Sequence, residues 1–185
     1  MIISKEDFLL QQSVSLDELK KKKLYTIVAV ILLAAMYIII FNFSADSGDE
    51  SSDISAKIAD FIYKIYYKIV GSGTGAPVEA VVEQADPLEA FIRKLAHFTE
   101  YLCVGFLSYG IMLMWYKHKW KERGLVVLQV FVSGALDEFH QYFVPGRWAS
   151  FKDVLIDTAG GVTGILLLVG IERKIRNKKK EPECS

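Results

Sequence analysis

The segment Ala135-Leu-Asp-Glu-Phe-His-Gln-Tyr-Phe-Val-Pro-Gly-Arg147 decides how this chain is interpreted. Four polar side chains interrupt a run that is otherwise apolar enough to cross a membrane: Asp137, Glu138, His140 and Gln141. Ionisable residues inside a membrane span are energetically costly, and they usually face the interior of a helix bundle or a water-filled cavity. The segment therefore predicts a membrane helix with a functional site near one end.

Two further polar segments lie on apolar runs to either side of this one. The first is Arg93-Lys-Leu-Ala-His97-Phe-Thr-Glu100-Tyr101, and the second is Asp153-Val-Leu-Ile-Asp157-Thr-Ala-Gly160. Three such groups in one small membrane protein indicate a shared site more strongly than a single polar residue does, because each one separately carries the cost of burial in lipid.

The composition also favours a membrane protein. Hydrophobic residues make up 52% of the 185 residues, the mean hydropathy is +0.27, and the apolar residues are gathered into long blocks. The length suits about one domain. A net charge of zero gives no reason to expect a nucleic-acid partner, and two cysteines do not indicate a disulfide framework.

We predict an all-α polytopic membrane protein with four crossings. Residues 24–43 form an uninterrupted apolar run long enough for one crossing, and longer than the core of a signal peptide, so we expect it to be retained. The other crossings are expected at about 91–116, 124–142 and 154–171. The membrane domain then spans 24–171, between a cytoplasmic segment at 1–23, expected to form a short weak helix, and a basic cytoplasmic tail at 172–185.

The loop between the first two crossings, residues 44–90, is predicted to contain an amphipathic helix at 54–70. Apolar residues recur there at steps of three and four, with Lys57, Asp60, Lys64 and Lys68 on the other face. This pattern fits a helix lying in the membrane interface. It fits equally well a helix that packs as part of a soluble lid, and we leave both readings open.

The distribution of lysine and arginine predicts the orientation. Residues 1–23, 117–123 and 172–185 contain five, four and six of the 22 basic residues, whereas the loop from residue 44 to residue 92 contains nine acidic residues. Basic loops remain on the cytoplasmic side. Both termini are therefore expected inside, and the loop 44–90 outside.

With this orientation, the three polar groups lie at one depth. His97, Asp137 and Asp157 each fall roughly 5 to 10 Å below the outer ends of their helices, at 1.5 Å per residue. Helical spacing also gives each group one face. The three faces consist of Arg93, His97, Glu100 and Val104, then of Ser133, Asp137, His140 and Gln141, and then of Asp153, Asp157, Gly160 and Gly164. Glu138 is turned about 100° from Asp137. We expect a cleft in the outer leaflet, covered by the amphipathic helix.

These residue types support several kinds of chemistry. His97, Glu100 and Asp137 are the candidate catalytic residues, with His97 as general base and the carboxylates orienting it. A divalent metal is an alternative, with His97, Glu100, Asp137 and His140 as candidate ligands, although no named zinc motif is present. Arg93 and Arg147 are suited to holding a phosphate or carboxylate. The remaining candidate binding residues are Glu138, His140, Gln141, Asp153 and Asp157.

At these residues the chain resembles the VanZ family of bacterial membrane proteins. The similarity is carried by the three polar segments quoted above, in this order, and by Phe43-Ser44 after the first crossing. It covers most of residues 24 to 170, with the loop from Ser44 to Asp86 poorly matched. The family pattern usually has Asn at the position of Asp157, so this chain adds a carboxylate there.

The resemblance implies a multi-pass protein of the bacterial cell membrane. The member that names the family is associated with resistance to the glycopeptide teicoplanin, which carries a lipid tail and acts outside the membrane. The expected partners are therefore membrane lipids and either a lipid-linked cell-wall precursor or a lipoglycopeptide. One alternative is a non-catalytic accessory protein whose polar network supports a partner protein. A transporter is disfavoured, because the inner halves of the crossings offer almost no polar path.

Overall fold

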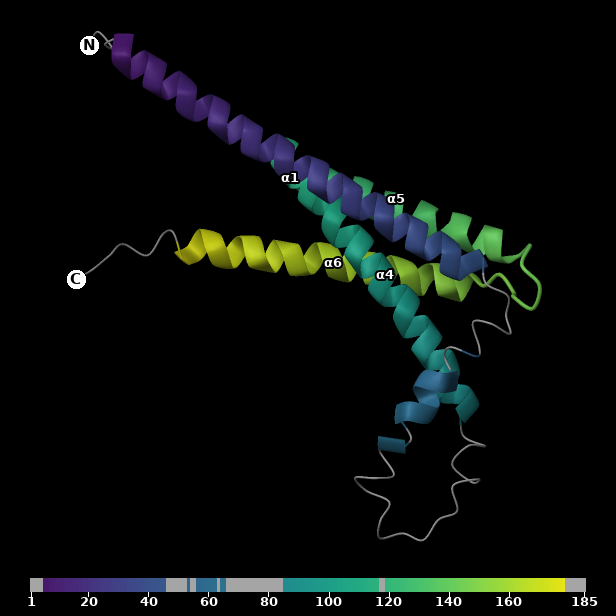
Figure 1. Cartoon of the computed structure of the whole chain (residues 1–185). Coiled ribbons are helices and arrows are strands. Elements are labelled where there is room, and N and C mark those ends of the chain that lie inside the picture. Colours follow the sequence, from purple (N-terminus) through teal and green to yellow (C-terminus); the bar gives the residue numbers. More distant parts are fainter. Residues whose placement is uncertain are drawn as a thin grey trace.

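The computed structural model describes residues 5–45, 53, 56–62, 64–65, 85–116 and 119–178, and all regular structure in these residues is helical. Four long helices follow one another: α1 (Lys5–Ala45), α4 (Ala85–Trp115), α5 (Lys119–Gln141) and α6 (Phe151–Lys178) (Figure 1). The prediction of an all-α fold is confirmed for this part of the chain.

Three of these helices contain a stretch long and apolar enough to cross a membrane: Leu16–Ala45, Ala90–Trp115 and Phe151–Lys178. They contain the crossings predicted at 24–43 and 154–171, and all but the last residue of the one predicted at 91–116. The crossing predicted at 124–142 coincides with α5, which is helical but is not one of the three. Four polar residues at its end, from Asp137 to Gln141, lower its mean hydropathy. The chain is thus a multi-pass membrane protein by three candidate spans, and the fourth crossing stays a prediction.

The ends of the helices differ from the predicted boundaries. A separate short helix was expected before residue 24, but α1 runs unbroken from Lys5 to Ala45. This segment contains neither glycine nor proline, and lysine is a good helix former, so nothing interrupts the helix. The segment from residue 172 to Lys178 also lacks glycine and proline, so α6 continues beyond its predicted end at 171.

The loop between the first two crossings is only partly described. Within the amphipathic helix predicted at 54–70, residues 56–62 and 64–65 are helical. The rest of that helix, and the segment from 71 to 84, lie outside the described residues.

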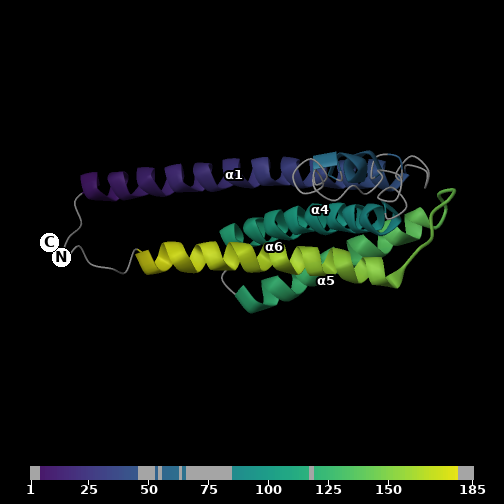
Figure 2. The same cartoon turned by 90° about the horizontal axis from the view of Figure 1, so that it is seen from below.

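The helices bring three chain segments to one end of the bundle. Figure 2 shows the C-terminal end of α1, the N-terminal end of α4 and the connection between α5 and α6 at the same end. That connection, residues 142–150, contains turns around Pro145 and Gly146, as predicted. We call this side of the molecule the turn end. Polar residues near these helix ends are therefore neighbours, although they are far apart in sequence.

The most extensive contact in the bundle is between α4 and α6, and it is built on glycine. At three places a Cβ atom on a glycine would collide with a backbone carbonyl oxygen of the other helix. The pairs are Gly160 with Phe98, Gly164 with Leu102, and Gly105 with Gly161. We call these residues the glycine seam. Small residues allow membrane helices to approach closely, and the glycine seam permits this between α4 and α6.

Below the turn end, the helices enclose an apolar core that includes Tyr101, Val104, Tyr109, Val130 and Ile165, all buried. By contrast, α1 leaves most of its apolar side chains exposed. Such a surface suits contact with lipid, since lipid tails are as apolar as these side chains. The polar site therefore lies at one end of a bundle whose centre is packed with apolar side chains.

Candidate functional site

A cavity of about 390 Å³ opens at the turn end, between α4, α5, α6 and the connection from α5 to α6. Most of the site residues predicted from the sequence line it. They are Arg93, His97, Glu138, Gln141, Arg147, Asp153 and Asp157. The predicted cleft between three polar helix faces is therefore present, and its chemistry depends on how these side chains are arranged.

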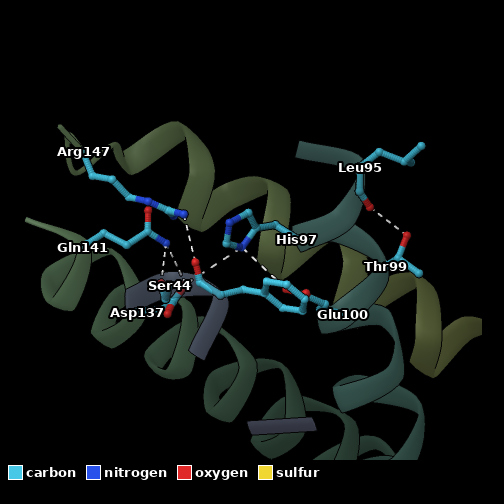
Figure 3. Close-up of polar contacts among 9 residues, drawn as sticks. Ser44, Leu95, His97, Thr99, Glu100, Asp137, Gln141 and Arg147 are labelled. Carbon is cyan, nitrogen blue, oxygen red and sulfur yellow. Dashed lines mark hydrogen bonds and ion pairs between the residues drawn. The ribbon is translucent and has the colours of Figure 1, made fainter. Parts of the chain in front are cut away.

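His97 occupies the centre of the polar group. Its Nδ1 atom lies 3.9 Å from Oδ2 of Asp137 and 3.8 Å from Oε2 of Glu100. Figure 3 shows the imidazole ring between the two carboxylates (Figure 3). Both distances exceed hydrogen-bonding range, and Nδ1 has no hydrogen-bond partner. Nδ1 of His97 therefore lies between two carboxylate groups and is hydrogen-bonded to neither.

Asp157 completes the group from α6. Among the described residues its side chain is one of the most buried, with 1% of the residue exposed, and neither carboxylate oxygen has a hydrogen-bond partner there. Gly134 of α5 provides the space, because a Cβ atom there would lie only 3.3 Å from Oδ2 of Asp157. Ligand atoms of His97, Asp137 and Asp157 all lie within 4.8 Å of one another. The structure therefore brings together the three residues that the sequence places at one depth.

Gln141 holds Asp137 in position and connects it to α1. Its Nε2 atom donates to Oδ2 of Asp137 at 3.0 Å and to Oγ of Ser44 at 2.7 Å. All three side chains are buried. Gln141 therefore acts on the group through Asp137, and it also ties the C-terminal end of α1 to α5.

Glu138 lines the cavity but has a contact of its own. Its Oε2 atom accepts a hydrogen bond from the backbone N–H of Ser150 at 2.6 Å. The carbonyl oxygen of Ser150 in turn accepts from the backbone N–H groups of Asp153 and Val154, so Ser150 lies at the start of α6. Glu138 therefore fixes the position at which α6 begins.

Basic side chains surround the mouth of the cavity. Nη2 of Arg147 donates to the carbonyl oxygen of Phe43 at 2.9 Å, and Nζ of Lys94 lies 3.1 Å from Oδ1 of Asp153. Arg93, which is half-buried, also lines the cavity. Gly146 has a φ angle of 74°, a conformation that glycine adopts without strain, and it turns the chain immediately before Arg147. The cavity is therefore cationic at its mouth and acidic at its base.

His140 does not join this group, although the sequence places it on the same helix face as Asp137. Its ring stacks on Phe41 of α1 with centroids 4.7 Å apart. An angle of about 60° separates the two residues around the helix axis, in the direction opposite to Gln141. This small rotation is enough to turn the imidazole away from the polar cavity, so His140 does not lie with His97, Asp137 and Asp157.

His140 and Asp137 instead line a second cavity, of about 340 Å³, between α1, α4 and α5. Its walls are mostly apolar and include Ile40, Phe41 and Leu136. Asp137 thus faces this apolar cavity, while its neighbours His97 and Gln141 line the polar one. The two cavities lie on either side of the same carboxylate.

The sequence interpretation missed several residues that shape the site. Lys94 lines the cavity and pairs with Asp153, Ser44 binds Gln141, and Gly134 accommodates Asp157. Signals existed for two of them, because Lys94 adjoins Arg93 and Ser44 belongs to the matched Phe43-Ser44. Nothing in the sequence indicated that Gly134 faces Asp157, because that contact joins two helices.

The comparison with known protein families gives one match, to VanZ/LLP1, over residues 28–172. No curated protein and no solved structure matches the chain. The matched range is most of the chain and contains every residue of the polar cavity. The family suggested by the three polar segments is therefore confirmed, and this chain belongs to the VanZ/LLP1 family.

Proposed function

We propose that this protein binds an amphipathic, anionic molecule of the cell envelope in its polar cavity, on the outer side of the membrane. The observation that carries the proposal is the pairing of two cavities. A polar cavity with Arg93, Lys94 and Arg147 around its mouth adjoins a mostly apolar one, and Asp137 and its contacts separate them. An amphipathic ligand needs both kinds of surface within a short distance.

The basic mouth suits a phosphate or carboxylate head group. Arginine offers several donors in a planar arrangement that matches such groups. Lys94 and Arg147 already have partners in Asp153 and the Phe43 carbonyl, which hold their side chains near the mouth. An arriving anion would share these cations and would not have to order them, which lowers the entropic cost of binding.

The apolar cavity suits an acyl or polyprenyl chain. Two of its polar residues, Tyr37 and Ser133, bond to each other, because the Tyr37 hydroxyl lies 2.9 Å from Oγ of Ser133; the hydroxyl also accepts from Nε2 of Gln129 at 2.7 Å. A lipid-linked cell-wall precursor and a lipoglycopeptide such as teicoplanin both combine an apolar tail with a polar, anionic part. The family resemblance to the teicoplanin-resistance protein favours these two.

The proposed topology has four crossings, with both termini inside and the turn end outside. It rests on the basic segments at 1–23, 117–123 and 172–185 and on the helical state of α5. A cysteine replacing Trp148 should react with a membrane-impermeant maleimide added to intact cells, and one replacing Lys174 should not. Labelling of Lys174→Cys without permeabilisation contradicts this topology.

The binding proposal is tested with the purified full-length protein in detergent and two probes, a lipid-linked cell-wall precursor and teicoplanin. A ligand at 100 times its Kd stabilises the folded state by about 2.7 kcal/mol. Arg93→Gln should weaken binding at least tenfold, because a charged hydrogen-bonding partner is lost, about 1.5–3 kcal/mol. Lys152→Gln, which removes an exposed cation outside the cavity, is the matched control.

Three results are informative. A thermal shift with either probe that Arg93→Gln loses and Lys152→Gln keeps supports the proposal and identifies the ligand. A shift that both variants lose equally points to general charge attraction and contradicts it. No shift with either probe also contradicts it. Release of a chemically changed probe would add a reaction, for which His97, Glu100 and Asp137 are the candidate catalytic residues.

A structural role for the polar network is the second candidate, and specific contacts favour it. Gln141 to Ser44 and Arg147 to the Phe43 carbonyl both tie the end of α1 to the rest of the bundle. A non-catalytic accessory protein needs such contacts to present a fixed surface to a partner. In that case Arg93→Gln would leave ligand binding unchanged, while Gln141→Ala would abolish the association with the partner.

A further inference from the structure

We infer that His97, Asp137 and Asp157 form a binding site for a divalent transition-metal ion, with Zn²⁺ as the best match. The site lies at the base of the polar cavity, and it uses atoms different from those that would hold an anion at the mouth. It therefore goes beyond the proposed function and does not depend on it.

The geometry places one donor atom from each of three helices around a common point. The atoms come from α4, α5 and α6 and lie within 4.8 Å of one another. Zinc bonds of about 2.1 Å in tetrahedral geometry separate the ligand atoms by roughly 3.4 Å. Small side-chain rotations supply the difference, and His97 Nδ1 and both Asp157 oxygens have no hydrogen bond to break.

The second observation is the state of Asp157. A carboxyl group that is 99% buried and accepts no hydrogen bond from the described residues is costly to ionise, and a bound cation would stabilise its charged form. Among the described residues, Lys94 pairs with Asp153, and neither oxygen of Asp157 accepts a hydrogen bond from a cationic side chain. A bound cation would compensate the charge of Asp157 and of Asp137 together.

The surroundings of the three residues are those of a metal site. Gln141 donates to Asp137, and such hydrogen bonds from outer partners orient metal-binding carboxylates. Glu100 lies 3.8 Å from Nδ1 of His97. It is near enough to act as a fourth ligand, or to make the electrostatic potential at the metal site more negative. Gly134 leaves space for Asp157, because a Cβ atom there would lie 3.3 Å from its Oδ2 atom.

The ligand types favour zinc over magnesium or calcium. Magnesium and calcium are bound by oxygen alone, whereas an imidazole ligand is typical of zinc and its neighbours in the first transition row. Three protein ligands leave a fourth position open, as in catalytic zinc sites. His97 and Asp157 both line the cavity, so the open position would face it, within reach of a bound head group.

Metal content tests the inference without any lipid. The tag-free full-length protein in detergent is incubated with ZnCl₂, excess metal is removed, and zinc is counted by mass spectrometry. We expect about one zinc per chain, reduced at least tenfold in His97→Ala and in Asp157→Asn. Asp153→Asn is the matched control, since it removes a cavity carboxylate outside the three ligands and should keep the zinc.

A second measurement separates loss of metal from loss of fold. Zinc should raise the Tm of the wild type and of Asp153→Asn, and chelation should reverse the increase, while Asp157→Asn should keep a cooperative transition that zinc does not move. The inference is overturned if the folded wild type binds no zinc, or if Asp157→Asn binds as much as Asp153→Asn. Arg93→Gln should retain zinc while losing the lipid probe, so failure of either proposal is seen separately.

Discussion

A methyl group added to the glycine seam should destabilise the protein more than any other alanine substitution of a helix glycine. In Gly160→Ala the new Cβ would collide with the carbonyl oxygen of Phe98. Non-bonded heavy atoms require about 3.5 Å, so α4 and α6 would have to separate by on the order of 1 Å. A backbone carbonyl cannot rotate away as a side chain can. The cost should therefore reach the upper end of the range for overpacking, about 3 kcal/mol.

The assay is thermal unfolding of the purified protein in one detergent, followed by tryptophan fluorescence. For a chain of this size, 3 kcal/mol corresponds to a decrease in Tm of roughly 6 to 12 °C. Gly124→Ala and Gly170→Ala are the matched controls, because a Cβ at either position meets nothing within 4 Å. These two should be unchanged or more stable by about 0.5–1 kcal/mol, since alanine favours helix. A Tm for Gly160→Ala within about 2 °C of the controls would refute the packing argument.

Three further predictions concern the polar residues. Without added metal, His97→Ala and Asp137→Asn should leave Tm unchanged or raise it, because groups held for function are often not optimal for stability; decreases of several degrees in both would make the group structural. Glu138→Gln weakens a charged hydrogen bond to the Ser150 N–H and should lower stability by about 1 kcal/mol by the same assay; an unchanged Tm contradicts its role in starting α6. Arg123→Ala removes a hydrogen bond and cation–π contacts and should lower the stability by about 1–2 kcal/mol; if Arg123→Lys, which keeps the charge, loses no stability, the charge alone is the cause and the prediction fails.

The helices were predictable because each rests on a long apolar run that a bilayer would accept. The boundaries of the helices were less predictable, since charge patterns mark the edge of the membrane and not the end of a helix. The lysines at 20–23 were read as a boundary, yet α1 continues through them, because lysine is a good helix former.

The meeting of His97, Asp137 and Asp157 could be foreseen from depth and helical period, since residues at one depth on facing helices must be close. The depth of a residue in the membrane does not, however, fix the direction in which its side chain points around the helix axis. A rotation of about 60° from Asp137 decides that His140 stacks on Phe41, and one of about 100° decides that Glu138 faces the cavity. These outcomes depend on how α1 and α6 pack around α5, which no local pattern in α5 specifies.

The contact between α4 and α6 also sets the order in which the site can be assembled during synthesis. These two helices form the largest interface, yet α5 lies between them along the chain. His97 and Asp137 are synthesised earlier, but the cavity between them has no third wall until residues 151–164 of α6 follow and the glycines meet. A chain that stops before that point would hold His97 and Asp137 without the wall that Asp157 and the glycine seam provide.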